Sequence, residues 1–348
     1  NMLKIPTFRQ DLVGVADLAE EVARFYGYAN IPSTLPSGSS TSGRISFKHR
    51  VEDVAKATAE FCGFSEGMTF SFESPKVFDK LRLDGDDPLR QAITIANPQG
   101  EDYSIMRTLP LNGMMVSLAR NYNRRNKNVK LYEMCKVYLP KALPLTEYPD
   151  EREMFTLGFY GEGDFFTMKG VVEELLEKIG MRNLITYDPA AGKNFLHPGR
   201  QANIIYDDVV IGYLGEVHPA VVDNYDMKGR VYIAALDMPC IVEKATFDRY
   251  FKGIAKYPAV GRDISMTVKK DILVGQIEAV FRKKGGKILE SYSLFDIYEG
   301  SQIQEGYKSV AYSLTFRAAD RTLEDAEVNA AMNKILEALA ELGIELRK

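Results

Sequence analysis

The feature that most constrains the fold is the segment 196–219, LHPGRQANIIYDDVVIGYLGEVHP. Two runs rich in β-branched residues, 201–206 and 209–214, flank the pair Asp207-Asp208, and this pattern predicts a β-hairpin. An isolated hairpin is marginally stable at best in water, so we expect these strands to lie in a larger sheet of a central domain. Three glycines are expected to let the backbone pass close to other backbone: Gly199, Gly212 and Gly215.

The composition is that of an ordinary globular protein, with 348 residues that are 45% hydrophobic and 26% charged. This length suits two or three domains. A net charge of −4 argues against binding nucleic acid over the whole surface, although it leaves room for a local basic face. Cys62, Cys135 and Cys240 have no metal-binding spacing, which favours a reducing compartment, and we expect a cytoplasmic protein. No apolar run approaches the length of a membrane span, and no signal peptide is recognised.

Composition and breakers divide the chain into four parts. Residues 1–36 form a first segment that ends in Pro-containing sequence, and 37–43 (SGSSTSG) is a linker by composition. A central domain is expected over 44–247 and a smaller domain over 248–348. The Asn1-Met2 start resembles a tag remnant, so we expect a fragment of a longer protein.

Periodicity predicts an α+β central domain, with a largely antiparallel sheet flanked by helices. The expected helices span 49–61, 111–122 and 166–179. The expected strands, besides the hairpin, span 69–72, 129–139, 154–160 and 231–236.

The first segment carries a cluster of acidic residues: Asp11, Asp17, Glu20 and Glu21. On a helix, positions 17, 20 and 21 share one face, and oxygen-only ligands suit Mg²⁺ or Ca²⁺ rather than zinc. The spacing by itself favours a solvated acidic face near a helix start, where the helix dipole favours carboxylates.

No motif in the sequence supplies a catalytic nucleophile or a phosphate-binding loop. The three histidines, His49, His197 and His218, lack metal-ligand spacing, and the last two each precede a proline at one end of the hairpin segment. The polar run 120–127, which contains Arg120, Arg124 and Lys127, is expected to be an exposed helix end unless a phosphate partner exists.

The last hundred residues follow the order βαββαβ, which is the ferredoxin-like split unit. The expected strands are 262–268, 287–298, 309–316 and 344–347, and the expected helices are 274–284 and 322–342. Thr322 is expected to cap the second helix, with Asp325 three residues further on.

Strand alternation predicts which residues face away from the helices of this domain. Phe295 and Ile297 should face the helices. Four residues should then lie on the open face: Asp296, Tyr298, Ser309 and Arg347. Residues 249–317 hold twelve Lys/Arg against seven Asp/Glu. An uncovered basic sheet with an aromatic residue is typical of single-stranded RNA binding, although a solvated or protein-binding face has the same pattern.

Several motifs in this order resemble the C-terminal part of the β subunit of bacterial phenylalanyl-tRNA synthetases. The resemblance rests on Phe8–Asp11 with Asp17–Tyr28, Asn97-Pro98, Met106–Leu109, Leu196–Arg200, Gly215–Pro219, Tyr257–Asp263 and Phe295–Gly300. It implies a class II synthetase-like core, residues 44–247, that is not the catalytic copy, followed by a ferredoxin-fold anticodon-binding domain.

The resemblance also implies specific roles. It places a Mg²⁺ site, shared with the α subunit, at Asp11, Asp17, Glu20 and Glu21. It places tRNA-anticodon contacts at Ala259, Asp296, Tyr298, Ser309 and Arg347. ATP and phenylalanine would bind to the α subunit of an (αβ)₂ enzyme, so no catalytic residue is expected here, and the family's editing domain would lie upstream. Two other classes remain open: a non-enzymatic RNA-binding or assembly protein, and a stand-alone Mg²⁺ enzyme.

Overall fold

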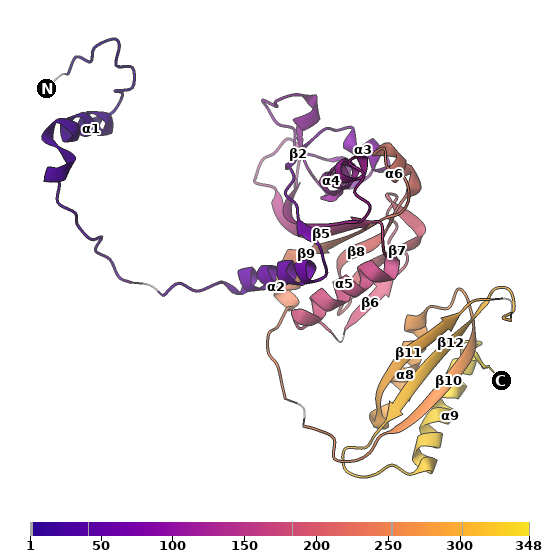
Figure 1. Ribbon diagram of the computed structural model, residues 1–348. Coiled ribbons are helices and arrows are strands. Elements are labelled where there is room, and N and C mark those ends of the chain that lie inside the picture. The colour runs from indigo at the N-terminus through magenta and orange to yellow at the C-terminus, as the bar shows by residue number, and fades with distance from the viewer. Residues whose placement is uncertain (1–2, 41, 183, 252, 301, 348) are drawn as a thin grey trace. The chain divides into compact units, whose positions relative to one another are not determined.

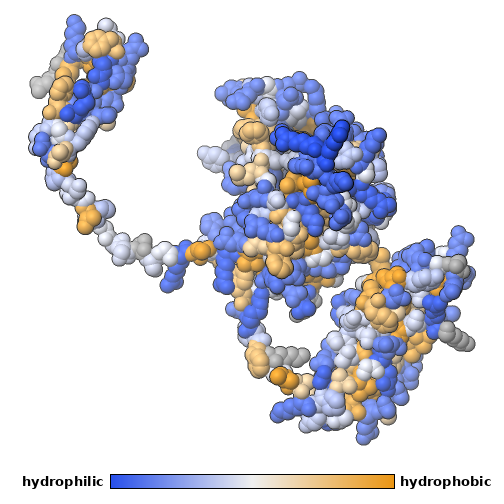
Figure 2. Space-filling model, viewed as in Figure 1, coloured by the Kyte–Doolittle hydropathy of each residue, from blue (hydrophilic) through white to orange (hydrophobic). Residues whose placement is uncertain are grey.

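The N-terminal part of the chain has little core of its own. The computed structural model describes residues 3–40, 42–182, 184–251, 253–300 and 302–347. It divides into two compact units, Asn1–Ser46 and Phe47–Lys348. In the first unit, helix α1 (Val15–Tyr26) has no buried residue, and Val15, Val22 and Phe25 are all exposed. Figure 2 shows hydrophobic side chains on the surface of this segment.

A seven-stranded sheet organises the central domain. The strand order is β1-β4-β5-β9-β8-β7-β6, and every neighbouring pair is antiparallel except β1 with β4. The bounds are β1 (Ser65–Glu66), β4 (Val129–Leu139), β5 (Asp150–Tyr160), β6 (Ile185–Asp188), β7 (Leu196–Tyr206), β8 (Val209–Val217) and β9 (Val231–Asp237). A separate two-stranded sheet pairs β2 (Phe72–Glu73) with β3 (Ile105–Met106).

Helices cover both faces of the large sheet, as Figure 1 shows. One core contains residues of α2 (Phe47–Phe61), α5 (Phe165–Lys178) and α7 (Met238–Lys244). The other contains residues of α3 (Val77–Lys80), α4 (Leu111–Asn123) and α6 (Pro219–Asn224). Neighbouring residues of one strand enter opposite cores, as Phe159 and Tyr160 do, because strand side chains alternate between faces. No helix in the described ranges is long and apolar enough to cross a membrane.

The predicted hairpin is confirmed. The backbone of both Asp207 and Asp208 is in the left-handed region, with φ of 49° and 61°, as a tight two-residue hairpin turn requires. A side chain on Gly212 would place its Cβ 2.4 Å from the carbonyl oxygen of Ala235, so this glycine does allow a close approach. For Gly199 that expectation is wrong, because the nearest atom would be 3.6 Å away in the ring of His197.

The predicted strand 69–72 is wrong. The backbone N–H of Thr69 donates to the Glu133 carboxylate at 3.0 Å rather than to a strand, and pairing begins only at Phe72. Arg107 completes this network, since its Nη1 donates to the Thr69 hydroxyl at 3.0 Å and its Nε donates to the Lys136 carbonyl at 2.6 Å. The bonds satisfy Arg107 and Glu133, which are each 3% exposed.

The C-terminal domain confirms the predicted βαββαβ order. Its elements are β10 (Val260–Lys269), α8 (Val274–Lys284), β11 (Leu289–Tyr298), β12 (Tyr307–Phe316), α9 (Asp325–Glu341) and β13 (Glu345–Leu346). The sheet order is β11-β12-β10-β13, and both helices share a core with one sheet face (Figure 1). The prediction that Thr322 caps α9 is wrong, because the helix begins at Asp325 with Glu324 as its N-cap and the Glu327 carboxylate accepting from the Glu324 N–H.

Candidate nucleic-acid interface

The uncovered face of the C-terminal sheet gathers four of the predicted RNA-binding residues near one end. Tyr298 on β11 pairs with Ser309 on β12, and Asp296 pairs with Ala311. Every second residue of β12 lies in the core with the helices: Val310, Tyr312, Leu314 and Phe316. Asp296, Tyr298 and Ser309 therefore share the face that carries no helix.

A β-bulge corrects one part of the prediction. The register of β11 against β12 shifts between Leu294 and Asp296, so Phe295 is an extra residue without a direct partner. Phe295 was expected to face the helices but its side chain is 58% exposed. Ile297 pairs with core residue Val310 and so has the predicted orientation, although it stays 44% exposed. After the bulge, side chains of β11 again alternate between the two sheet faces from Asp296 to Tyr298.

Ser309 is less accessible than the sequence suggests. It is 3% exposed, because the neighbouring strands place Tyr298 and Thr267 on either side of it and Arg347 lies close by. Arg347 follows β13, and its backbone N–H donates to the Ser265 carbonyl at 2.8 Å. Its Nη1 donates to the Ser309 hydroxyl at 3.3 Å. Ser309 thus positions the guanidinium of Arg347, which stays exposed.

Gly300 is a positioning residue that the sequence analysis missed. A Cβ on Gly300 would lie 2.3 Å from the Tyr298 hydroxyl oxygen and 2.5 Å from the ring carbon that bears it. The ring of Tyr298 therefore lies directly over the Gly300 backbone, and it remains 39% exposed. A glycine two residues after a predicted exposed aromatic residue is the signal that could have identified it.

Ala259 does not join this cluster. It precedes β10, whose residue Val260 pairs with Phe316, whereas Ser309 pairs with Thr267. The seven-residue separation along the strand corresponds to about 23 Å at roughly 3.3 Å per residue. Ala259 is exposed at the far end of the sheet, so any role in RNA binding concerns a different nucleotide from those near Tyr298.

The charged groups next to this cluster are mostly fixed by local partners. Lys270 forms an ion pair with Glu299 at 2.7 Å, and this contact lowers the pKa of Glu299. Lys308 donates to the carbonyl of Ile272 at 2.9 Å, and burial lowers its pKa. The exposed guanidinium of Arg347 and the exposed carboxylate of Asp296 remain available to a ligand.

The N-terminal unit contains the four predicted metal ligands, but Arg9 binds two of them. Its Nη2 donates to Asp11 at 2.7 Å and to Glu21 at 2.6 Å. These bonds lower the pKa of Asp11, and together with Arg24 they lower that of Glu21 to about 2. No group of three or more His, Cys, Asp or Glu side chains able to hold a metal ion is found in the described ranges.

Among the described residues, Arg9 pairs with neither of the other two carboxylates. Asp17 accepts from the backbone N–H groups of Val13 and Gly14 at 2.9 and 2.7 Å, which lowers its pKa and satisfies the start of α1. Glu20 is exposed on α1. The donor chemistry suits a hard cation, and in this structure the guanidinium of Arg9 lies where two of the carboxylates meet.

The two hairpin histidines have structural roles. Nδ1 of His218 accepts from the Ala220 N–H at 3.1 Å and so caps α6, and burial lowers the pKa of this histidine. Nδ1 of His197 accepts from the Gly199 N–H at 3.1 Å. In both cases the imidazole accepts a hydrogen bond from the backbone N–H of the residue two positions further along the chain.

Comparison with known proteins assigns the family. Residues 31–238 match the family described as the phenylalanyl tRNA synthetase beta chain CLM domain. The chain belongs to the phenylalanyl-tRNA synthetase beta chain family. Residues 255–347 match the ferredoxin-fold anticodon binding domain, and residues 2–28 match the tRNA synthetase B5 domain.

Relatives in this family match almost the whole chain. It is 43% identical to the phenylalanine–tRNA ligase beta subunit of Clostridium tetani and 45% identical to that of Clostridium acetobutylicum. The alignments cover 99% and 98% of this chain but only 44% and 43% of those subunits. The chain therefore spans less than half the length of these relatives. Among solved structures, pyrrolysyl-tRNA synthetase from Desulfitobacterium hafniense superposes with a TM-score of 0.47 and 12% identity, over 56% of this chain and 68% of that one.

Proposed function

We propose that this chain forms the scaffold and anticodon-binding part of a phenylalanine–tRNA ligase. The observation that carries the proposal is the cluster of Asp296, Tyr298 and Arg347 on the uncovered face of a domain that matches an anticodon-binding family. An anticodon base can stack on the exposed ring of Tyr298. The Arg347 guanidinium can bind a phosphate or stack on a base, and Asp296 can accept hydrogen bonds from a base edge.

Attachment of phenylalanine to tRNA with ATP is proposed for an assembly with a separate α subunit. We expect ATP and phenylalanine to bind to the α subunit, the assembly to be an α₂β₂ tetramer, and the enzyme to be cytoplasmic.

An apolar surface near β1 supports a role in binding a partner subunit. β1 is the edge strand of the large sheet, and the segment around it exposes Phe61 (89%), Met68 (91%) and Phe70 (74%). Exposed aromatic side chains beside a sheet edge are typical of protein–protein interfaces. We propose that the α subunit covers this surface.

The magnesium site is proposed as one that a partner completes. Asp11, Asp17, Glu20 and Glu21 are oxygen donors of the kind that Mg²⁺ prefers, but they do not form a complete ligand set within the described part of the chain. A shared site would require Asp11 and Glu21 to exchange Arg9 for the ion. Bound Mg²⁺ would supply a fixed positive charge that links the two subunits.

A reconstitution tests the proposal. The chain is mixed with the α subunit of a bacterial phenylalanine–tRNA ligase, the complex is isolated, and tRNA-Phe is titrated against an unrelated tRNA. Complex formation with preferential binding of tRNA-Phe is the expected result. RNA binding without any α-subunit complex would instead favour an independent RNA-binding protein.

A further inference from the structure

The central domain contains a second surface with the features of a ligand site, remote in sequence from the anticodon-binding domain. A cavity of about 670 Å³ lies where α4 ends, where β5 leads into α5, and where the loop 228–230 enters β9. Its volume lies within the range typical of small-molecule sites. It is built entirely from residues 122–232 of one compact unit.

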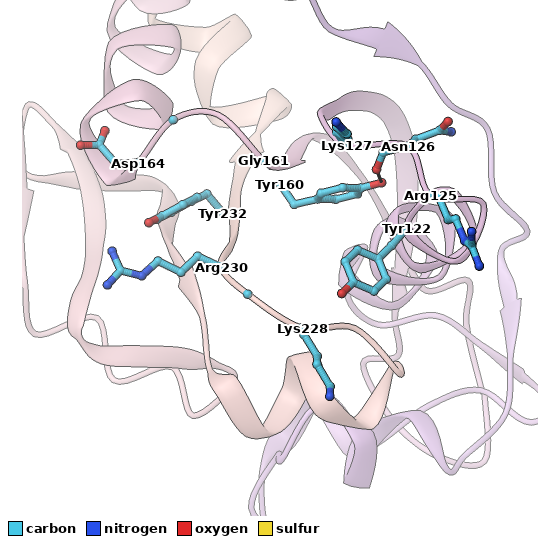
Figure 3. A pocket seen from close by; sticks show the side chains of 12 residues that line it. Tyr122, Arg125, Asn126, Lys127, Tyr160, Gly161, Asp164, Lys228, Arg230 and Tyr232 are labelled. Atoms are coloured by element: carbon cyan, nitrogen blue, oxygen red, sulfur yellow. Dashed lines mark hydrogen bonds between the residues drawn. The ribbon is translucent and has the colours of Figure 1, made fainter.

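Three tyrosines form the aromatic part of this cavity. Tyr122 and Tyr160 pack edge to face with ring centroids 5.7 Å apart, and the Tyr160 hydroxyl donates to the Asn126 carbonyl at 2.9 Å. The ring of Tyr232 stacks on that of Phe159, with ring centroids 5.1 Å apart. Figure 3 shows Tyr122 and Tyr160 on one side of the cavity and Tyr232 on the other. Tyr160 and Tyr232 are 6% and 2% exposed, whereas Tyr122 is only half-buried, so Tyr122 offers most of the accessible aromatic surface.

Positive charge surrounds these rings. The cavity is lined by four cationic side chains from two loops: Arg125, Lys127, Lys228 and Arg230. For Arg125, Lys127 and Lys228, no ion pair exists with any residue that the structure describes. Figure 3 shows Arg230 beside Tyr232 and Lys228 below Tyr122. In a chain with a net charge of −4, this grouping is a local excess of positive charge.

Two acidic groups at or near the cavity already have hydrogen-bond partners other than its four cations. Asp164 is the acidic residue among those lining the cavity, and its Oδ1 accepts from the backbone N–H and hydroxyl of Thr167 at 2.9 and 3.1 Å. Glu216 lies 3.9 Å from Nε of Arg230, but both of its oxygens accept from Arg200, at 2.6 and 3.0 Å. The lining therefore carries four cationic residues and one acidic residue, an excess of positive charge.

The two loops on the Tyr160 side are fixed against each other. A Cβ on Gly161, where φ is 102°, would lie 2.6 Å from the Lys127 carbonyl oxygen, so only glycine fits this turn. The N–H of Glu162 donates to the Asn128 side chain at 3.1 Å. The cavity wall is thus preorganised rather than formed by a loose loop.

We propose that this cavity binds a nucleotide, with its base against the ring of Tyr122, which is the most accessible of the three tyrosines, and its phosphate at the basic loops. A bare phosphate would leave the Tyr122 ring unused, and an apolar ligand would leave the cations without counterions. Stacking on aromatic rings together with phosphate binding by Lys and Arg is the combination that nucleotides require. The nucleotide can be a free mononucleotide or one unit of an RNA strand. The site does not depend on the proposed anticodon contacts.

Equilibrium binding to the full chain tests this, with AMP, inorganic phosphate and a short oligoribonucleotide as probes. The double substitution Lys127→Ala/Lys228→Ala removes one cation from each loop. Its control, Lys141→Ala/Lys244→Ala, removes one lysine that follows β4 and another that ends α7. We expect AMP affinity to fall on the order of tenfold in the cavity variant and to stay unchanged in the control.

Substitutions at Tyr122 test the base contact. Tyr122→Leu should weaken AMP binding and leave phosphate binding unchanged, whereas Tyr122→Phe, which keeps the ring, should bind AMP as the wild type does. A larger loss of oligoribonucleotide affinity than of AMP affinity in the lysine variant would identify RNA as the source of the nucleotide.

Two results would overturn the proposal: equal binding of every probe by the cavity variant and its control, or inorganic phosphate bound as tightly as AMP. Tyr298→Ala should leave AMP binding unaffected, so failure here is distinguishable from failure of the anticodon proposal.

Discussion

Glu73 makes the stability of the central domain depend on pH. This carboxyl on β2 is 3% exposed, and its Oε1 accepts from Nδ2 of Asn112 at 2.9 Å. Its Oε2 has no hydrogen-bond partner among the described residues. Burial raises the pKa of Glu73 from 4.5 to about 7, against the opposing effects of the Asn112 hydrogen bond and the Arg107 charge.

The sign and size of the effect follow from this pKa. Between pH 4.5 and about 7, the unfolded chain loses the Glu73 proton while the folded chain keeps it, so stability falls as pH rises. At about 1.4 kcal/mol per pKa unit, the loss is about 3 kcal/mol by pH 7 and stays constant above it. The opposite trend is expected for carboxylates whose folded pKa is lowered.

The substitution Glu73→Gln removes this titration while keeping an acceptor for Asn112. Calorimetric unfolding of the central domain at pH 5 and at pH 8 should show the variant gaining about 2.5 kcal/mol relative to wild type between the two values. Glu162→Gln, at an exposed carboxylate of the same domain, is the matched control and should change neither value. An unchanged difference between Glu73→Gln and wild type at the two pH values would refute the reasoning.

Three further predictions concern the capping histidine, the apolar surface and the metal site. Burial lowers the pKa of His218, so its stabilising contribution is complete above about pH 6.5 and is lost as pH falls through the folded pKa. His218→Asn keeps an acceptor that can cap α6 and cannot become protonated in this range. Thermal unfolding of this variant between pH 5 and 7.5 should therefore not show the loss of stability at low pH. Phe61→Ser with Met68→Ser should weaken copurification with the α subunit by tenfold or more, about the effect of losing one interface hot spot. Both side chains are about 90% exposed, so the melting temperature of the chain should not fall. Asp17→Asn keeps the acceptor for the Val13 and Gly14 N–H groups, so α1 should be intact by circular dichroism while Mg²⁺ no longer raises the melting temperature of the complex; a Mg²⁺ response equal to that of wild type would exclude Asp17 as a ligand.

The sequence predicted the elements whose signals are local. The hairpin at Asp207-Asp208 and the βαββαβ order both follow from residues that are adjacent in the chain. The strand at 69–72 was mispredicted because its donor, the Thr69 N–H, bonds to Glu133, which lies 64 residues away. A single-sequence pattern contains no information on such a partner.

The candidate site shows the same division. Tyr298 and Asp296 have the predicted orientation, but the bulge that places Phe295 outside the alternation has no signature in an apolar–polar pattern. The resemblance grouped Ala259 with the other four residues, whereas the strand register separates it from them. The role of Gly300 emerges only from the Tyr298 ring that lies over it.

The anticodon proposal is tested most directly by titrating tRNA-Phe against the complex of this chain with an α subunit. Tyr298→Ala is compared with wild type and with Tyr148→Ala, a matched control at a tyrosine that is 91% exposed in the central domain. Loss of one stacking platform should cost about 1–3 kcal/mol, which is roughly a five- to 150-fold rise in Kd, in Tyr298→Ala alone. Equal tRNA affinity in wild type and Tyr298→Ala would contradict the assignment of this sheet face to anticodon binding.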